Sequence, residues 1–123
     1  MCYLNLYKAP ALDSALKTAL DERLPEWIAH AVERDSAKWS GYGLRPLDVA
    51  PTAESPWRPL LADSVESQLD HLIQSQADDG SWHPYWNWGG NFPEAWPAAK
   101  LKWQAVLTLN SLQTLRSYGR LPV

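Results

Sequence analysis

The stretch Leu72–Trp82 (LIQSQADDGSW) marks the point at which a helix ends and a tight turn begins. The apolar residues that lead into it recur at helical spacing; they are Val65, Leu69, Leu72 and Ile73. Gly80 supplies the tight turn after two aspartates, and Gly, Pro and Asn residues continue from 78 to 97. The stretch therefore predicts a helix that gives way to a long loop.

A second helix is expected after this loop, from about Ala98 to Tyr118, with Gly119 as the residue that ends it. Its apolar positions also recur at helical spacing; they are Leu101, Ala105, Leu109, Leu112 and Leu115. We expect this stripe to face inward. Asp63 or Ser64 is expected to cap the helix that precedes the loop.

The N-terminal half has a similar helical pattern. Apolar residues recur at helical spacing from Leu12 onward, and Asp13 or Ser14 can cap the start. Pro25 either kinks this helix or opens a second one. Four prolines and two glycines between 39 and 59 forbid a long helix there and predict an ordered connection.

These patterns predict an all-α fold built from αα-hairpins. The chain is interpreted as a single helical domain, 1–123, in three segments: a helical hairpin over 1–38, a Pro-rich connection over 39–62, and a helix–loop–helix repeat over 63–119. Residues 1–7 fit both an alternating strand and one face of a helix, so their pattern leaves the choice open.

Composition excludes several classes of protein. The formal net charge is −3, whereas a nucleic-acid-binding domain normally presents a basic face. No run approaches the about 18 apolar residues of a membrane span, and the N-terminus lacks the apolar core of a secretory leader, so we expect a cytoplasmic protein. Cys2 is the only cysteine, which excludes an intrachain disulfide and a multi-cysteine zinc site. We expect no metal and no cofactor.

The spacing of Leu72, Gln76, Gly80 and Trp82 is the most specific pattern in the chain. It resembles the QW repeat of squalene–hopene and oxidosqualene cyclases and of the related prenyltransferases. The resemblance covers 72–82 well, although the basic-small pair that usually opens such a repeat is missing from 66–68. It implies that Gln76, Gly80 and Trp82 hold helices together and do no chemistry, with Trp82 stacked on the Gln76 amide.

The same resemblance implies an α/α toroid, a closed ring of helical hairpins that this chain cannot complete. Repeats of this kind bury their faces against neighbours, and three or more are usually needed for stability. We therefore expect either a homo-oligomer or adjoining helical repeats from a larger protein. The catalytic part of the resemblance fails, because Asp78 and Asp79 do not form the acidic motif of the cyclases.

The loop that follows the QW motif is rich in aromatic residues, and eight of the 123 residues in the chain are Trp. The aromatic residues of the loop are Trp82, Tyr85, Trp86, Trp88, Phe92 and Trp96. Such side chains can stabilise a carbocation, stack on sugar rings, anchor a protein partner or fill a small core. The residues assigned to ligand binding are Tyr85, Trp86, Trp88 and Trp96, together with His83.

Two acid–base pairs are conceivable in this region. His83 could act with Glu94, and His71 could act with Asp70 or Asp79. Each histidine has an ordinary structural alternative, because a histidine at such a position more often caps a helix or bonds a backbone carbonyl. The catalytic candidates are therefore weak ones.

Three functions follow from these residues. The leading hypothesis is a helical-repeat protein that binds a hydrophobic terpenoid or prenyl molecule through its aromatic loop. The alternative is a non-catalytic interaction module in which the Trp-rich loop forms an interface. A weaker third hypothesis is a carbohydrate-active α/α protein.

Overall fold

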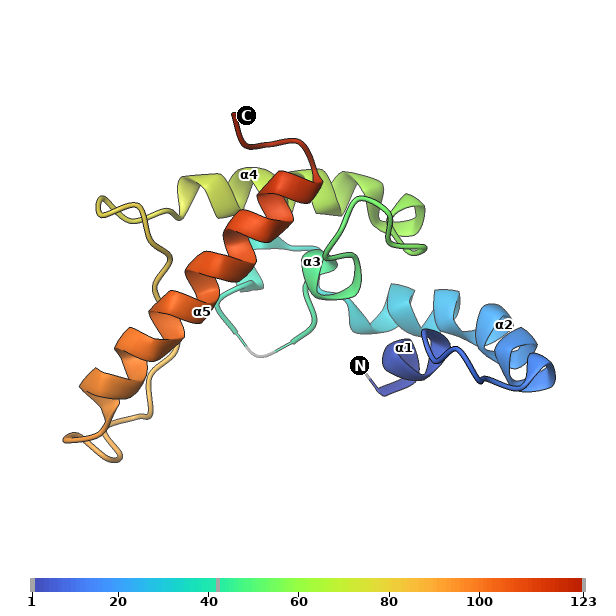
Figure 1. Ribbon diagram of the computed structural model, residues 1–123, viewed down its shortest axis with the longest axis horizontal. Helices are drawn as coiled ribbons and strands as arrows, with labels where there is room; N and C mark the ends of the chain where they lie inside the picture. The colour runs from blue at the N-terminus through green and yellow to red at the C-terminus, as the bar shows by residue number, and fades with distance from the viewer. Residues whose placement is uncertain (1, 42, 123) are drawn as a thin grey trace. The chain divides into compact units, whose positions relative to one another are not determined.

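The computed structural model describes residues 2–41 and 43–122, and within them the ordered elements are helices (Figure 1). They are α1 (Cys2–Tyr7), α2 (Ser14–Ala31), α3 (Pro46–Val49), α4 (Ala62–Gln74) and α5 (Trp96–Ser117), with short 3-10 turns η1 (Ser36–Lys38) and η2 (Pro59–Leu61). No strand forms in the described ranges, where extended pairing is limited to a bridge between Val32 and Leu44. The all-α prediction is confirmed.

The chain divides into two compact units, 1–65 and 66–123, and each is described by itself. In the first unit α1 packs on α2, and residues 2–7, whose pattern left the choice open, are helical. Asp13 caps α2 as expected, since its carboxylate accepts a hydrogen bond of 3.2 Å from the Ala15 amide. Pro25 lies inside α2 and does not divide it.

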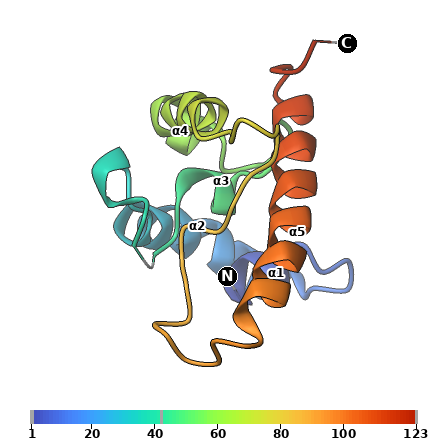
Figure 2. The same cartoon turned by 90° about the vertical axis from the view of Figure 1, so that its left-hand side faces the viewer.

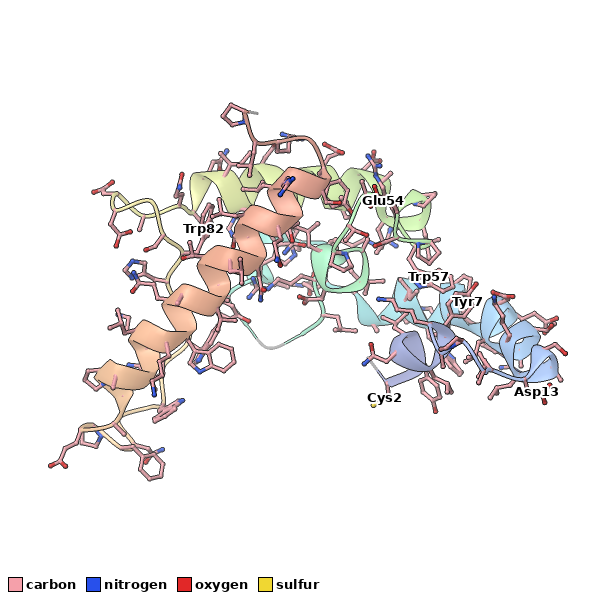
Figure 3. The ribbon with its side chains drawn as sticks, viewed as in Figure 1. Cys2, Tyr7, Asp13, Glu54, Trp57 and Trp82 are labelled. Atoms are coloured by element: carbon pink, nitrogen blue, oxygen red, sulfur yellow. The ribbon has the colours of Figure 1, made fainter. Side chains whose placement is uncertain are left out.

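The core of the first unit combines one face of α2 with aromatic residues of the connection. Its buried apolar residues include Leu4, Leu20, Leu24, Ile28, Val32, Trp39, Val49, Trp57 and Leu61. Tyr7 and Trp57 lie close together in Figure 3, with ring centroids 5.3 Å apart. The Pro-rich segment thus supplies residues to a core.

The second unit consists of α4, the loop over 75–95 and α5, and the loop runs from the end of α4 to the start of α5 (Figure 2). Helix α4 begins at Ala62, so Asp63 and Ser64 lie within its first turn and the predicted cap is wrong. The reason is that η2 leads directly into α4. A chain that is already helical leaves no free helix start to be capped.

Helix α5 ends as its sequence predicted, at a glycine in the left-handed region. Gly119 has φ +70°, its amide donates to the Arg116 carbonyl, and the Arg120 amide donates to the Leu115 carbonyl. These are the two hydrogen bonds of a Schellman motif. The motif also sets the direction in which the chain leaves the helix.

That exit brings Arg120 to two carboxylates of α4. Its guanidinium donates to Asp70 at 3.0 Å and also pairs with Glu66. Both contacts raise the pKa of Arg120, with Glu66 the larger cause. The ion pairs therefore connect α4 to the residue that follows α5.

The prediction of an inward-facing stripe on α5 is wrong for most of its length. Leu115 is buried, but the remaining positions of the stripe are exposed; they are Leu101, Ala105, Leu109 and Leu112. Trp103 and Val106, which lie off the stripe, are exposed as well. Because apolar side chains occur on several sides of α5, their spacing alone did not identify the packed side.

Candidate functional site

The turn after α4 brings together two of the polar groups that the QW pattern singled out. The Gln76 side-chain amide donates a hydrogen bond of 2.8 Å to the Gly80 carbonyl. The Gly80 amide bonds back to the Ala77 carbonyl, and Gly80 has φ +85°. The glutamine therefore closes the turn from within, and only a residue without a Cβ adopts this backbone conformation readily.

Trp82 connects this turn to both helices of the second unit (Figure 3). Its indole N–H donates to the Leu72 carbonyl at 2.8 Å, in the last turn of α4. Its backbone amide donates to the Thr108 hydroxyl of α5 at 3.1 Å. The ring is only 5% exposed. These bonds satisfy one free carbonyl at a helix end and hold the two helices together.

Asp79, His83 and Gln104 form a small polar cluster around Ser81. The Asp79 carboxylate accepts from both the hydroxyl and the amide of Ser81. Gln104 donates to the same hydroxyl at 2.8 Å. His83 lies 3.6 Å from Asp79. The Ser81 bonds are the main cause that lowers the pKa of Asp79, and the histidine contributes less.

The histidine pairings differ from those expected. His83 pairs with Asp79, whereas the sequence suggested Glu94 for His83 and His71 for Asp79. The His83 and Asp79 side chains are 41% and 57% exposed. An ion pair in contact with water is weak, and it lacks the dry surroundings that strengthen catalytic electrostatics. His71 is exposed on α4 and Glu94 is exposed before α5.

The aromatic residues of the loop pack on one another in two groups. Trp86 meets Tyr85 at 5.0 Å and Trp103 of α5 at 5.4 Å, both edge to face. Trp88 meets Trp96 at 5.1 Å and Phe92 at 5.9 Å. Edge-to-face contacts at these distances are favourable for aromatic pairs. The four aromatic residues assigned to ligand binding thus use part of their surface in contacts with other aromatic residues.

Trp103 of α5 was not among the residues predicted for this cluster. Its side chain is 43% exposed and pairs with Trp86 of the loop. Phe92, which follows Gly89, Gly90 and Asn91 and itself has φ +52°, is 69% exposed. A signal for Trp103 was present, because it lies off the stripe that was expected to face inward. The aromatic cluster therefore presents several ring surfaces to solvent.

An apolar groove of about 510 Å³ lies along α5 beside this cluster. It is lined by the exposed stripe and by the polar residues that hold the turn; they are Ser81, Leu101, Gln104, Ala105, Thr108, Leu109 and Leu112. Leu101 is 66% exposed and Leu109 is 57% exposed. A soluble protein seldom leaves so many neighbouring apolar side chains in water unless they bind something.

The described part of the chain offers no group of three or more His, Cys, Asp or Glu residues that could hold a metal ion. Among the same residues, each helix is too short or too polar to cross a membrane. The chemistry available at the site is therefore that of aromatic rings, an apolar groove and one exposed ion pair.

Comparison with known proteins adds no relative. No protein-family model, curated protein or solved structure matches this chain. The resemblance to the QW repeats accordingly rests on Leu72, Gln76, Gly80 and Trp82 alone.

Proposed function

We propose that residues 66–123 form a helical-repeat module whose α5 binds an amphipathic helix of a neighbouring helical hairpin. The observation that carries the proposal is the exposed apolar face of α5, centred on Leu109. A helix with such a face buries it when it packs against another helix. The QW-type turn supports the same function, because repeats of that kind are stabilised by their neighbours.

The shape of the groove favours a helix over a small molecule. Its apolar positions run from Leu101 to Leu112, about 16 Å along the helix axis at 1.5 Å per residue. Helix-in-groove recognition uses apolar anchors at i, i+3, i+4 and i+7 of the bound helix, and a stripe of this length can meet them. A small ligand usually needs most of its surface buried, whereas the leucines here remain more than one-third exposed.

The charges on α5 indicate what kind of helix would bind. Residues 96–117 contain three basic residues and no acidic residue. Lys102 and Arg116 each lie seven residues from Leu109, so the helical repeat places them on its face, one towards either end of the stripe. A partner with carboxylates beside its apolar residues would be complementary to these cations. The proposed partner is therefore an acidic amphipathic helix.

A synthetic peptide tests this proposal. The probe is a helix of about 20 residues with leucines at i, i+4 spacing and glutamates beside them; a second peptide replaces the glutamates with lysines. Binding to the full chain is measured by fluorescence anisotropy. We expect the acidic peptide to bind about tenfold more tightly at low salt, with a difference that shrinks as salt rises.

Two variants distinguish binding in the groove from non-specific binding. Leu109→Glu places a charge in the stripe and should abolish binding. Asn110→Glu adds the same charge at the next, exposed position and should leave binding nearly unchanged. Equal affinity for both peptides would contradict the proposal. If light scattering shows that the chain self-associates and that Leu109→Glu abolishes the association, the partner of α5 is a second copy of the chain and not an acidic helix.

A second candidate function is the binding of a terpenoid or prenyl molecule at the aromatic loop. The exposed rings of Tyr85 and Phe92 favour it, because aromatic faces stack on flat or apolar groups. Phe92 is the only phenylalanine in the chain, so fluorinated phenylalanine gives one NMR signal at this loop. A saturable shift with geraniol would support this function. A shift with maltotriose instead would favour carbohydrate binding, and no shift with either would exclude both.

A further inference from the structure

The first unit contains an apolar pocket that takes no part in the function proposed above. Its volume is about 200 Å³. Four of the lining residues are buried, with exposed fractions between 2% and 6%; they are Leu4, Leu24, Ile28 and Val49. Tyr3 and Trp27 also line it and are exposed. The pocket therefore has an apolar floor within the core and an aromatic pair where it meets solvent.

Three parts of the chain build this pocket, and hydrogen bonds join one of them, the connection, to the segment that follows α2. Helices α1 and α2 supply most of the lining, and Leu44 and Val49 come from the connection. The Glu33 amide donates to the Leu44 carbonyl at 2.8 Å, next to the bridge at Val32. The Trp39 indole donates to the Glu33 carbonyl at 2.8 Å. These two hydrogen bonds hold the connection against the residues that follow α2.

The chemistry of the lining determines what the pocket can accept. Every lining residue in the described chain is aliphatic or aromatic, and none carries a charge. A charged molecule would lose hydration there and meet no opposite charge, so its entry would cost several kcal/mol even if the Tyr3 hydroxyl or the Trp27 indole N–H donated a hydrogen bond to it. A non-polar molecule would instead release water from apolar surface.

The volume of the pocket limits the size of the ligand. An engineered apolar cavity of about 150 Å³ in another protein binds benzene. A pocket of about 200 Å³ is therefore suited to one ring with a short alkyl group. The rings of Tyr3 and Trp27 lie 4.9 Å apart and inclined at 45°, so a ring that enters would meet both aromatic and aliphatic surfaces.

We propose that this pocket is a binding site for a small, neutral, single-ring hydrocarbon or a molecule that presents such a group. The site lies wholly within residues 1–65. It is independent of the α5 face, so either proposal can fail without the other.

The chain contains two isoleucines, which makes a direct test possible. Ile28 lies in the floor of the pocket, and Ile73 lies exposed on α4 in the other unit. Selective ¹³C labelling of the isoleucine δ1 methyl group gives one NMR signal from each residue. We expect toluene to shift the Ile28 signal saturably, through the ring current of the bound probe, and to leave Ile73 unmoved. Benzoate, its charged counterpart, should bind at least about tenfold more weakly.

A pair of variants with the same substitution completes the test. Ala31 is the last residue of α2 and lines the pocket. Ala31→Phe should fill the pocket and abolish the toluene shift. Ala29→Phe adds the same ring at an exposed position outside the lining and should bind toluene normally. Circular dichroism reports that both variants keep their helices, and a dispersed Ile28 signal reports that residues 1–65 fold.

Three results would overturn the proposal. The first is an Ile28 signal that toluene does not move. The second is an equal shift of both isoleucines, or persistent binding in Ala31→Phe, which would indicate unspecific partition. The third is an Ile28 shift that depends on protein concentration without any probe, since a side chain of a second copy would then occupy the pocket.

Discussion

The two units differ in how far their large apolar residues are buried. In residues 1–65 the apolar face of α2 is buried, and the tryptophans of the connection, Trp39 and Trp57, are 2% and 8% exposed. In residues 66–123 the leucines of the α5 stripe other than Leu115 are 38% to 66% exposed, and Trp88 and Trp103 are 36% and 43% exposed. Similar helical patterns therefore lead to a core in one unit and to a surface in the other.

The difference teaches that an apolar stripe indicates a packing partner without saying where that partner lies. Helix α2 finds its partners within its own unit, namely α1 and the connection. Helix α5 contacts the turn after α4 through Gln104 and Thr108, by hydrogen bonds to Ser81 and Trp82. Its stripe lies beside that contact and remains exposed, which is the arrangement expected of a surface used in binding.

Replacing a tryptophan in each unit tests the contrast most strongly. Trp39→Ala should lower the free energy of unfolding by about 3–5 kcal/mol, because it empties a core site and removes the hydrogen bond to Glu33. Trp88→Ala should cost about 1 kcal/mol or less, since only its ring contacts with Phe92 and Trp96 are lost. Urea denaturation of both variants measures this, and equal costs would show that the aromatic loop is itself a core.

A leucine in each helix gives the next largest difference. Leu24→Ala in α2 should cost about 2–5 kcal/mol, since Leu24 is 2% exposed. Leu109→Ala in α5 should change stability by no more than about 0.5 kcal/mol, as is usual for exposed positions. Thermal and urea unfolding provide both values. A large cost at Leu109 would mean that the stripe is buried in solution, for example by a second copy.

Local chemistry was predicted well from the sequence because it depends on neighbours along the chain. The Asp13 cap and the glycine after α5 each need only residues within a few positions of one another. The turn at Gly80 was likewise expected from 72–82, although the partner of Gln76 proved to be the Gly80 carbonyl and not a helix end. For this reason, short-range hydrogen bonds can be predicted from a sequence.

Contacts between distant residues were predicted less well. His83 was expected to pair with Glu94, yet it lies against Asp79, which is closer along the chain. The exposed side of α5 depends on which neighbours are present, a property that helical periodicity does not encode. The pocket beneath Tyr3 and Trp27 requires α1, α2 and Val49 to meet, and the sequence left even the helical state of α1 open.

The end of α5 tests whether the second unit is as well defined locally as the first. Gly119→Ala should destabilise the chain by about 1–2 kcal/mol, because a Cβ disfavours the left-handed backbone at φ +70°. Gly119→Asn is the matched control and should cost less, since asparagine tolerates this conformation. The melting temperatures of the two variants give the comparison. Equal and negligible losses would mean that the Schellman turn contributes nothing to stability.

The smallest expected effect concerns the polar cluster that borders the exposed stripe. The pKa of Asp79 is lowered, so its contribution to stability is present above the pKa of an unfolded aspartate and is lost as pH falls through the folded value. Ser81→Ala removes the hydroxyl bond and keeps the amide bond, and it should move this pKa back towards its usual range more than His83→Gln does, because the bond from the Ser81 hydroxyl is the largest single cause. A carboxyl NMR titration measures both shifts. If His83→Gln had the greater effect, the ion pair and not the turn would organise the cluster, and the groove would be bordered by a pH-sensitive charge.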